Sequence, residues 1–395
     1  MKISDGQLHT PFLLKPVGKD YLWGGTRLND DFAKDLNLDP LAESWECSTH
    51  PDGLTLVGEP LCGSSSPAEE EADRPGACPS SAGEDSSEEE GTGHGLTLRE
   101  LLREHPEAVG THPLQTVREA GLPEGSLPIL IKFIDAKQDL SVQVHPDDAY
   151  ARAHEHGSLG KSEMWYVVDA ARDAHLIYGF RHDMDREKLR RALSDGTVEK
   201  YLQKVPVHKG DVFYIEAGTV HAICAGALVV EVQESSNLTY RLYDYCRVDR
   251  NGRERELHVD KGLAVANLKG SSEPRQPMRV LRYTPGLGSE FLCRCRYFEV
   301  EHLLLNTERI RGMAGFKTDS DSFQVLVCTD GCGVLGWEDT CRGSSGEAED
   351  TLPRGRDGGP LRHMLPFFRG DTIFVPADSV PVRIHGTAQF LKIRC

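Results

Sequence analysis

The sequence lacks the features that would place the protein in or across a membrane. None of its 395 residues belongs to an apolar run long enough to span a bilayer. The first residues, Met1 to Asp5, are not a basic segment that leads into an apolar core and a cleavage site. We therefore expect a cytoplasmic protein without a membrane partner.

Cysteine pairs and clustered basic residues are also missing. The 11 cysteines are an odd number, and no two of them are spaced as Cys-x-x-Cys, so neither a disulfide framework nor a structural zinc knuckle is expected. The net charge is −17, and Lys and Arg form no cluster that would neutralise the phosphates of a nucleic acid. The negative net charge does not exclude a small anionic ligand, because a pocket can bring a few basic groups together.

Two segments have no periodic apolar residues. Residues 63–95 are rich in Ser, Gly, Glu and Pro, and nine acidic residues stand there against one Arg. This composition cannot bury enough apolar surface to offset the entropy lost on ordering, which predicts a disordered insertion. A weaker insertion is expected at about 338–362. Each is expected to lengthen a hairpin loop, and neither to carry chemistry.

Most of the remaining sequence has the pattern of short β-strands, and its length is enough for two packed cores. Helices are expected after Thr97, which opens a capping box with Glu100, and at 185–193 and 198–202. A mostly β protein with few flanking helices suggests a sandwich or a jelly roll. The expected strands are Ile129–Phe133, Leu140–Val144, Met164–Val168, Asp211–Ile215, Leu228–Val232, Phe323–Val327 and Thr372–Val375.

One nine-residue pattern occurs twice, at Gly210–Gly218 and at Gly370–Asp378. A Gly-Asp turn that leads into an apolar strand resembles the second motif of a cupin jelly roll. The repeat therefore predicts two tandem jelly rolls, joined at the turn-forming cluster Gly270–Pro274. We expect a catalytic domain at 1–270 and a degenerate domain at 271–395.

Four potential metal ligands occur in the first half. Gln143 and His145 are two residues apart, which puts both side chains on one face of a strand. Glu163 opens a later strand, and His221 follows the first copy of the repeat. Because these strands are neighbours in a jelly roll, the four side chains could converge on one ion. Two imidazoles, a carboxylate and an amide oxygen suit zinc first, and iron, manganese or cobalt next.

The second copy of the repeat lacks these ligands. Pro381 aligns with His221, and the position of Glu163 falls at about Phe323. We therefore expect no metal in the second jelly roll. The alternative for the first one is that His145 and His221 are ordinary half-buried histidines.

An ordered series of motifs resembles the type I mannose-6-phosphate isomerases. The resemblance covers roughly residues 10–60 and 96–265, and the second jelly roll matches only loosely. The short spacing from Glu163 to His221 resembles the shorter bacterial form. The motifs are Leu22–Leu28, Ala42–Glu46, Ser141–Asp148, Gly160–Glu163, Gly218–Ile223 and Thr239–Tyr245.

The resemblance implies interconversion of mannose 6-phosphate and fructose 6-phosphate through a cis-enediol. It implies one zinc ion, held by Gln143, His145, Glu163 and His221. A divalent cation would stabilise the negative charge that develops on the enediol oxygens. Where longer relatives have an aromatic residue two positions after the last ligand, this chain has Ile223.

The resemblance also assigns the acid–base group and the cations. Glu231 matches the proposed catalytic base, with Glu46 and Glu234 as alternatives, and it could instead be a structural carboxylate. Arg241 and Lys161 match catalytic or substrate-binding positions, and Lys132 matches a substrate-binding one. A lysine within an apolar strand, as Lys132 is, requires a partner or a wet cavity. The sequence does not indicate which cation would bind the phosphate.

Two other functions remain open at this point. Cupins with histidine and carboxylate ligands also carry out iron-dependent oxygenase chemistry. A sugar-phosphate-binding module could also keep a metal site without turnover. The sequence does not indicate the oligomeric state.

Overall fold

The computed structural model describes residues 7–58, 95–248, 251–271, 274, 279–310, 312–338 and 362–395. The two expected insertions, 63–95 and 338–362, lie outside the described residues except at their ends. The strands on either side of the second insertion pair with each other as a hairpin. The division into domains at residue 270 stays a prediction.

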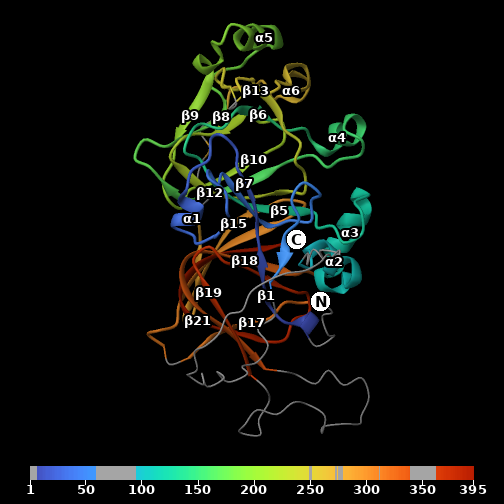
Figure 1. Cartoon of the computed structure of the whole chain (residues 1–395), viewed down its shortest axis with the longest axis vertical. Helices are drawn as coiled ribbons and strands as arrows, with labels where there is room; N and C mark the ends of the chain where they lie inside the picture. The colour runs from blue at the N-terminus through green and yellow to red at the C-terminus, as the bar shows by residue number, and fades with distance from the viewer. Residues whose placement is uncertain are drawn as a thin grey trace, which may run out of the picture.

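Two antiparallel sheets form the first barrel, in the upper half of Figure 1. The six-stranded sheet has the order β10 (Val212–Ile215), β7 (Glu163–Ala170), β12 (Ala227–Glu234), β5 (Ile129–Asp135), β3 (Glu43–Cys47), β2 (Val17–Lys19). The five-stranded sheet has the order β13 (Tyr240–Tyr243), β6 (Val142–Val144), β11 (His221–Ile223), β8 (His175–Phe180), β9 (Leu202–Pro206).

A ten-stranded antiparallel sheet forms the second barrel, below the first (Figure 1). Together with the first barrel it confirms the predicted mostly β fold with few helices. Its main path is β14 (Leu281–Thr284), β15 (Leu287–Arg294), β16 (Glu299–Asn306), β21 (Val382–Arg394), β18 (Gln324–Glu338), β20 (Thr372–Val375), β1 (Phe12–Lys15), β4 (Leu56–Val57); β17 (Ala314–Phe316) pairs with β21, and β19 (Arg362–Phe368) with β18.

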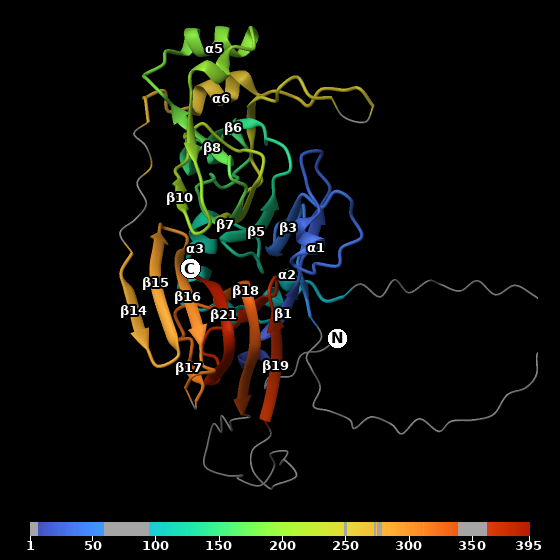
Figure 2. The ribbon, with the colours of Figure 1, turned by 90° about the vertical axis from the view of Figure 1, so that its left-hand side faces the viewer.

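The sheet of the second barrel includes two strands from the start of the chain. Strand β1 pairs with β20, with Leu13 opposite Ile373, and β4 pairs with β1. The next strands along the chain, β2 and β3, belong to the first barrel. In Figure 2, β1 therefore lies beside the strands of the second barrel although it precedes both barrels in sequence.

Apolar side chains fill both barrels and the space between them. One cluster, with Trp165, Phe213 and Val229, lies between the two sheets of the first barrel. A larger cluster joins the outer face of the six-stranded sheet, including Phe133, to the second barrel, including Phe374. The two barrels are therefore packed against each other through buried apolar surface.

The helices lie on the outside of the barrels (Figures 1 and 2). The capping box at Thr97 is confirmed, and Asp185 caps the helix that follows it. The second helix of the expected pair is only a short 3-10 turn, because Leu202 begins β9 and pairs with β8. The helices are η1 (Gln7–His9), α1 (Arg27–Asp30), α2 (Leu98–Glu104), η2 (Pro106–Val109), α3 (Thr111–Ala120), α4 (Asp148–His154), α5 (Arg186–Ser194), η3 (Val198–Lys200) and α6 (Val259–Val265).

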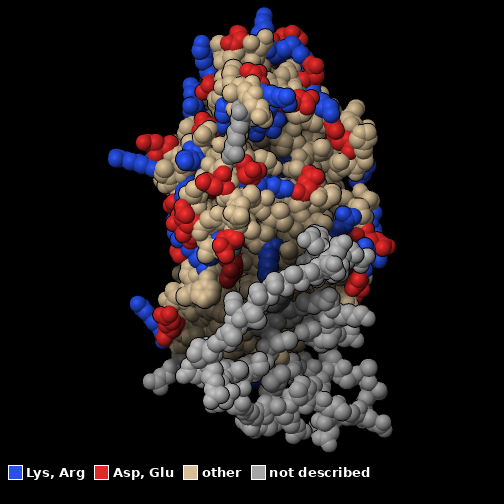
Figure 3. Space-filling view, viewed as in Figure 1, with Lys and Arg blue, Asp and Glu red and all other residues tan. Residues whose placement is uncertain are grey.

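The surface and the helices carry two further observations. No helix in the described part of the chain has the length and apolarity needed to cross a bilayer. On the face shown in Figure 3, acidic and basic side chains are interspersed over the first barrel.

The two copies of the sequence repeat adopt the same turn. Gly210 and Gly370 have φ values of +91° and +98°, a left-handed conformation that favours glycine. Asp211 and Asp371 each accept a hydrogen bond from the backbone N–H three residues earlier, at 2.8 and 2.7 Å. Each turn leads into a strand, β10 or β20. The repeat is therefore a structural one, as the sequence predicted.

Candidate metal centre

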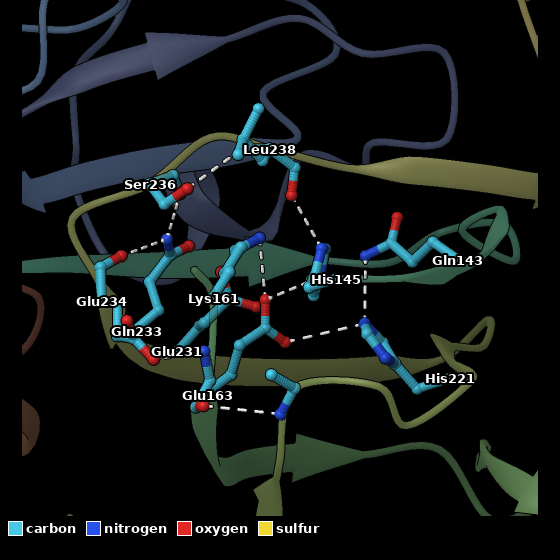
Figure 4. Close-up of polar contacts among 12 residues, drawn as sticks. Gln143, His145, Lys161, Glu163, His221, Glu231, Gln233, Glu234, Ser236 and Leu238 are labelled. Carbon is cyan, nitrogen blue, oxygen red and sulfur yellow. Dashed lines mark hydrogen bonds and ion pairs between the residues drawn. The ribbon is translucent and has the colours of Figure 1, made fainter. Parts of the chain in front are cut away.

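Four side chains from three stretches of chain meet inside the first barrel (Figure 4). In β6, Val142 and Val144 are buried in the cluster outside the five-stranded sheet. Because side chains alternate along a strand, Gln143 faces the barrel interior. His145 follows on the same face. Glu163 begins β7 in the opposite sheet, and His221 begins β11, directly opposite Gln143.

The four residues expected to bind metal are close together. The ligand atoms of His145, Glu163 and His221 lie within 4.8 Å of one another, and all three residues are buried. Nε2 of His145 is 3.2 Å from Oε1 of Glu163, and Nε2 of His221 is 3.7 Å from Oε2. The Gln143 amide lies 3.2 Å from Nε2 of His221 through its nitrogen. A half turn about its last bond would present the oxygen instead.

Backbone carbonyls orient both imidazoles. Nδ1 of His145 lies 2.8 Å from the carbonyl oxygen of Leu238, and Nδ1 of His221 lies 2.8 Å from that of Thr219. Because a carbonyl only accepts, each Nδ1 carries the proton of the neutral ring. The lone pair is then on Nε2, which in both rings faces Glu163.

The electrostatics of the site favour metal-binding protonation states. Burial lowers the pKa of His145 to about 3, helped by the positive charge of Lys161, and burial also lowers the pKa of His221. Burial alone would raise the pKa of Glu163. Nζ of Lys161, 2.7 Å from Oε1, outweighs this effect and holds that pKa well below its usual range. Two neutral imidazoles and a carboxylate are the forms that bind a divalent cation.

Unpartnered polar atoms test whether a metal ion fits. Among the described residues, Nε2 of His145 and Oε2 of Glu163 are buried without a hydrogen bond, and Oε1 of Glu163 has the ammonium of Lys161 as its partner but no hydrogen bond of normal geometry. Most buried polar atoms in folded proteins have a partner. A cation bound by the same atoms would satisfy all three, so these residues fit a divalent metal ion.

Two glycines allow the loops around the centre to take their positions. Gly218, at φ +89°, donates its N–H to the carbonyl of His145 at 2.8 Å. At Gly160 an added Cβ would lie 2.5 Å from the backbone of Asp147. That close approach allows the N–H of Lys161 to reach Pro146, which brings the lysine to the centre.

A buried network of charges lies beside the centre on the inner face of the six-stranded sheet. Lys132 is opposite Glu231 in the pairing of β5 with β12, and Nζ is 3.5 Å from Oε1 of Glu231 and 3.6 Å from Oε2 of Glu43. Burial would lower the pKa of Lys132, but the two carboxylates outweigh it and raise that pKa. The lysine therefore has the partners that its place in an apolar strand requires.

Glu231 combines a fixed position with a perturbed acidity. The indole N–H of Trp165 donates to its Oε2 at 2.9 Å. Burial, reinforced by the negative charge of Glu163, raises the pKa of Glu231 to about 7. A carboxyl group with a pKa near neutrality can both take up and release a proton.

The two other carboxylates considered as bases have different surroundings. Glu46 is fully buried between the barrels, where Nζ of Lys34 lies 2.6 Å away and Thr372 donates a hydrogen bond at 2.7 Å. Glu234 accepts the N–H of Ser162 at 2.9 Å, and burial raises its pKa to about 8. By strand alternation, each lies on the opposite face of its strand from the inner network.

Two neighbours of Lys132 were not assigned roles from the sequence. Oε2 of Glu43 accepts the indole N–H of Trp45 at 2.7 Å, and Nζ of Lys132 lies over the Trp45 ring, 4.7 Å from its centroid. Both residues are in the motif Ala42–Glu46. The feature of the sequence that could have indicated a role for Glu43 is a charged residue within an otherwise buried strand.

Arg241 lies at the edge of the centre. It is opposite Gln143 in the pairing of β13 with β6, so both side chains extend from the same face. Its guanidinium donates to the carbonyl of Glu256 at 2.9 Å and to Oγ of Ser141 at 3.3 Å. The structure thus brings Arg241 next to the proposed ligand Gln143, and the hydrogen bond to Glu256 holds the arginine against a loop.

The second barrel has different residues at the matching positions. Ile215 lies opposite Glu163, and Val375, its counterpart in the repeat, lies opposite Gln324. The sequence alignment, which placed the counterpart at about Phe323, was one residue off. In the described part of the chain, no second group of three His, Cys, Asp or Glu side chains comes as close together as the centre does. The absence of a second metal stays a prediction.

Comparisons with known proteins agree with this geometry. The family model for the phosphomannose isomerase type I catalytic domain matches residues 62–166. The putative mannose-6-phosphate isomerase YvyI of Bacillus subtilis is 33% identical over 390 residues, 97% of this chain and 98% of that protein. The mannose-6-phosphate isomerase ManA of the same organism is 32% identical over 379 residues, 96% of this chain and 97% of that protein.

Solved structures show the same architecture. The mannose 6-phosphate isomerase of Bacillus subtilis has a TM-score of 0.73 and 29% identity, over 97% of this chain and 99% of that one. A mannose 6-phosphate isomerase bound with zinc and yttrium shares the fold with a TM-score of 0.62 and 16% identity, over 97% of this chain and 99% of that one. Neither the oxygenase nor the binding-module alternative finds support in these comparisons. The chain belongs to the type I mannose-6-phosphate isomerase family.

Proposed function

We propose that the chain interconverts mannose 6-phosphate and fructose 6-phosphate at the centre in the first barrel. The observation that carries the proposal is the buried group of His145, Glu163 and His221, whose ligand atoms lie within 4.8 Å of one another. The same three residues would hold the metal ion, and Gln143 would complete the ligand set. When bound, a divalent cation stabilises the negative charge that develops on the substrate oxygens.

Zinc is the metal that we propose. Two imidazole nitrogens and a carboxylate oxygen are donors typical of catalytic zinc, and the amide oxygen of Gln143 would add a fourth. A protein of the same fold is described as bound with zinc. Iron, manganese and cobalt accept similar donors, so the choice depends on measurement.

Glu231 is the base that we propose. Isomerisation through a cis-enediol moves a proton between C1 and C2 of the sugar, so the same group must accept a proton and return it. Burial raises the pKa of Glu231 above that of an ordinary carboxyl group, which makes the carboxylate a stronger base, and the Trp165 indole fixes one carboxylate oxygen. Nζ of Lys132 on the other oxygen favours the charged form that accepts the proton.

Three cations are proposed to hold the substrate. Lys161 lies beside the ligand carboxylate, Lys132 beside the base, and Arg241 beside Gln143. We propose that they bind the sugar oxygens and the phosphate of a sugar phosphate. The absence of a nucleic-acid partner and a cytoplasmic location stay predictions.

A coupled assay tests the function directly. The purified protein is incubated with mannose 6-phosphate, and fructose 6-phosphate is measured before chelation, after chelation and after zinc is restored. We expect turnover that chelation abolishes and zinc restores. No turnover by the zinc-loaded protein would refute the proposal, and uptake of oxygen would support the oxygenase instead.

A matched pair of histidine variants tests the location of the site. His221→Ala removes a proposed ligand, so we expect loss of both zinc and activity. His302→Ala removes a buried histidine of the second barrel, which interacts with Glu290 and Gln389. The second variant should keep one zinc per chain. Loss of zinc from both variants alike would contradict the assignment.

A further inference from the structure

The loop between β12 and β13 carries one of the two carbonyls that orient the histidines. Leu238 lies in this loop, and its carbonyl oxygen is 2.8 Å from Nδ1 of His145. If this oxygen moved away, the proton of His145 could move to Nε2, which would then no longer be a lone-pair donor. The position of the loop therefore affects how readily His145 binds a metal ion.

The side chain of Gln233 holds this loop from inside the barrel. Gln233 is fully buried near the end of β12, opposite Glu163 in the adjacent strand. Its Nε2 donates to the carbonyl oxygen of Glu234 at 2.8 Å and to that of Ser236 at 2.6 Å. Because both partners are acceptors, the amide nitrogen must face them, which fixes the orientation of the amide.

Hydrogen bonds connect Ser236 to the orienting carbonyl. Oγ of Ser236 donates to the carbonyl of Leu159 at 3.0 Å and accepts the N–H of Leu238 at 3.4 Å. Figure 4 shows that hydrogen bonds link Gln233, Ser236, Leu238 and His145 in that order. This series of hydrogen bonds runs from Gln233, on the strand next to Glu163, to the ring of His145. The buried amide of Gln233 is therefore close to one proposed ligand and linked to another.

Gln233 is poorly explained as a packing residue. Within the described residues its Oε1 is buried and has no hydrogen-bond partner. An apolar side chain of the same length would fill the same space without an unpartnered oxygen. What only the amide supplies at this position is a donor to two carbonyls, that of Glu234 at the end of β12 and that of Ser236 in the loop.

We propose that Gln233 is a positioning residue for the metal centre, which it stabilises by holding the Leu238 carbonyl against Nδ1 of His145. The inference rests on the proposed function, because it takes His145 to be a metal ligand. Gln233 is not among the four proposed ligands, and its role would be to hold the loop that orients one of them. Groups that orient metal ligands in this way typically contribute a factor of 10 to 100 in metal affinity.

The test compares two glutamine-to-methionine variants of the full-length protein. Gln233→Met keeps the length of the side chain and removes both donated hydrogen bonds. Gln389→Met keeps the length of a glutamine of the second barrel and removes the hydrogen bond that its Oε1 accepts from His302. Zinc affinity is measured by competition with a chromogenic chelator, and thermal unfolding is measured after metal removal. We expect a 10- to 100-fold loss of affinity in Gln233→Met and a change below threefold in Gln389→Met.

Histidine tautomers provide a readout that a purely structural role would not change. In metal-stripped protein labelled with ¹⁵N-histidine, the His145 signals should report a proton on Nδ1, and in Gln233→Met a mixture of the two tautomers. Ser236→Ala interrupts the same series of hydrogen bonds with a smaller change, so it serves if Gln233→Met does not fold. It should weaken zinc binding in the same direction.

The outcomes separate this inference from the proposed function. If the unaltered protein binds zinc and loses it on His221→Ala, while Gln233→Met and Ser236→Ala bind as tightly as the unaltered protein, the inference alone is wrong. If Gln233→Met and Gln389→Met lose affinity equally, Gln233 has no special role. If the unaltered protein binds no zinc, both the inference and the metal-dependent function are overturned.

Discussion

Replacement of Glu231 by glutamine should separate activity from stability. The amide of Glu231→Gln keeps the shape of the carboxylate, and its oxygen can still accept the indole N–H of Trp165. It cannot take a proton from the sugar. Since a positioned base typically contributes a factor of 10² to 10⁴, we expect kcat to fall by that amount with the zinc content unchanged.

The same change should stabilise the protein at neutral and alkaline pH. Burial and Glu163 raise the pKa of Glu231 from its ordinary 4.5 to about 7, so the folded protein binds this proton more tightly than the unfolded chain does. Ionising Glu231 therefore destabilises the fold as the pH rises from 4.5 through 7. At about 1.4 kcal/mol for each pH unit, the cost reaches about 3 kcal/mol above pH 7. Glutamine has no such cost.

The assay is urea denaturation at several values between pH 5 and pH 8.5. It uses metal-stripped protein, because a bound divalent cation would favour the carboxylate and lower its pKa. The free energy of unfolding of Glu231→Gln, relative to the unaltered protein, should rise with pH by up to about 3 kcal/mol. Glu187→Gln, on the exposed side of α5, should follow the unaltered protein. Parallel curves for Glu231→Gln and the unaltered protein, or a kcat within threefold, would refute the reasoning.

Three further predictions follow from the same structure. Chelation of the metal should lower the melting temperature, since a ligand at 100 times its Kd stabilises the folded state by about 2.7 kcal/mol, and differential scanning fluorimetry measures this. Lys34→Met leaves Glu46 buried without its ion pair and should lower the free energy of unfolding, measured with urea, by about 3–5 kcal/mol. The double variant Lys34→Met with Glu46→Gln should recover most of this loss. Equal losses in the single and the double variant would contradict the prediction. Arg241→Ala should keep one metal ion per chain, measured by atomic absorption, and should lower kcat/KM at least tenfold. Full activity of this variant would show that the arginine only anchors the loop at Glu256.

The sequence predicted the parts of the fold and site that depend on local pattern. The turn at Gly210 and Gly370 recurs because each position requires a left-handed backbone that a glycine adopts easily. The convergence of Gln143 with His221 follows from strand alternation once a jelly roll is assumed. The strands that carry the proposed ligands could therefore be predicted from the sequence.

What the sequence did not predict depends on the folded path of the loops. The roles of Glu43 and Glu46 differ because alternation points one into the barrel and the other toward the second barrel. Gln233 reads as one more residue of an apolar strand, and only the turn after it brings two carbonyls to its amide. The one-residue difference between Phe323 and Gln324 has the same origin, since strand register is set by pairing across the sheet.

The crossing of β1 into the second barrel affects how the protein can be made. As the chain leaves the ribosome, residues 12–14 emerge long before their partners at 372–374. Until then β1 and β4 have no neighbouring strand from the second barrel, and an unpaired strand edge is prone to aggregate. A fragment that stops at residue 270 would keep this exposed edge, so expressing the first barrel alone calls for a supplied strand in place of β20.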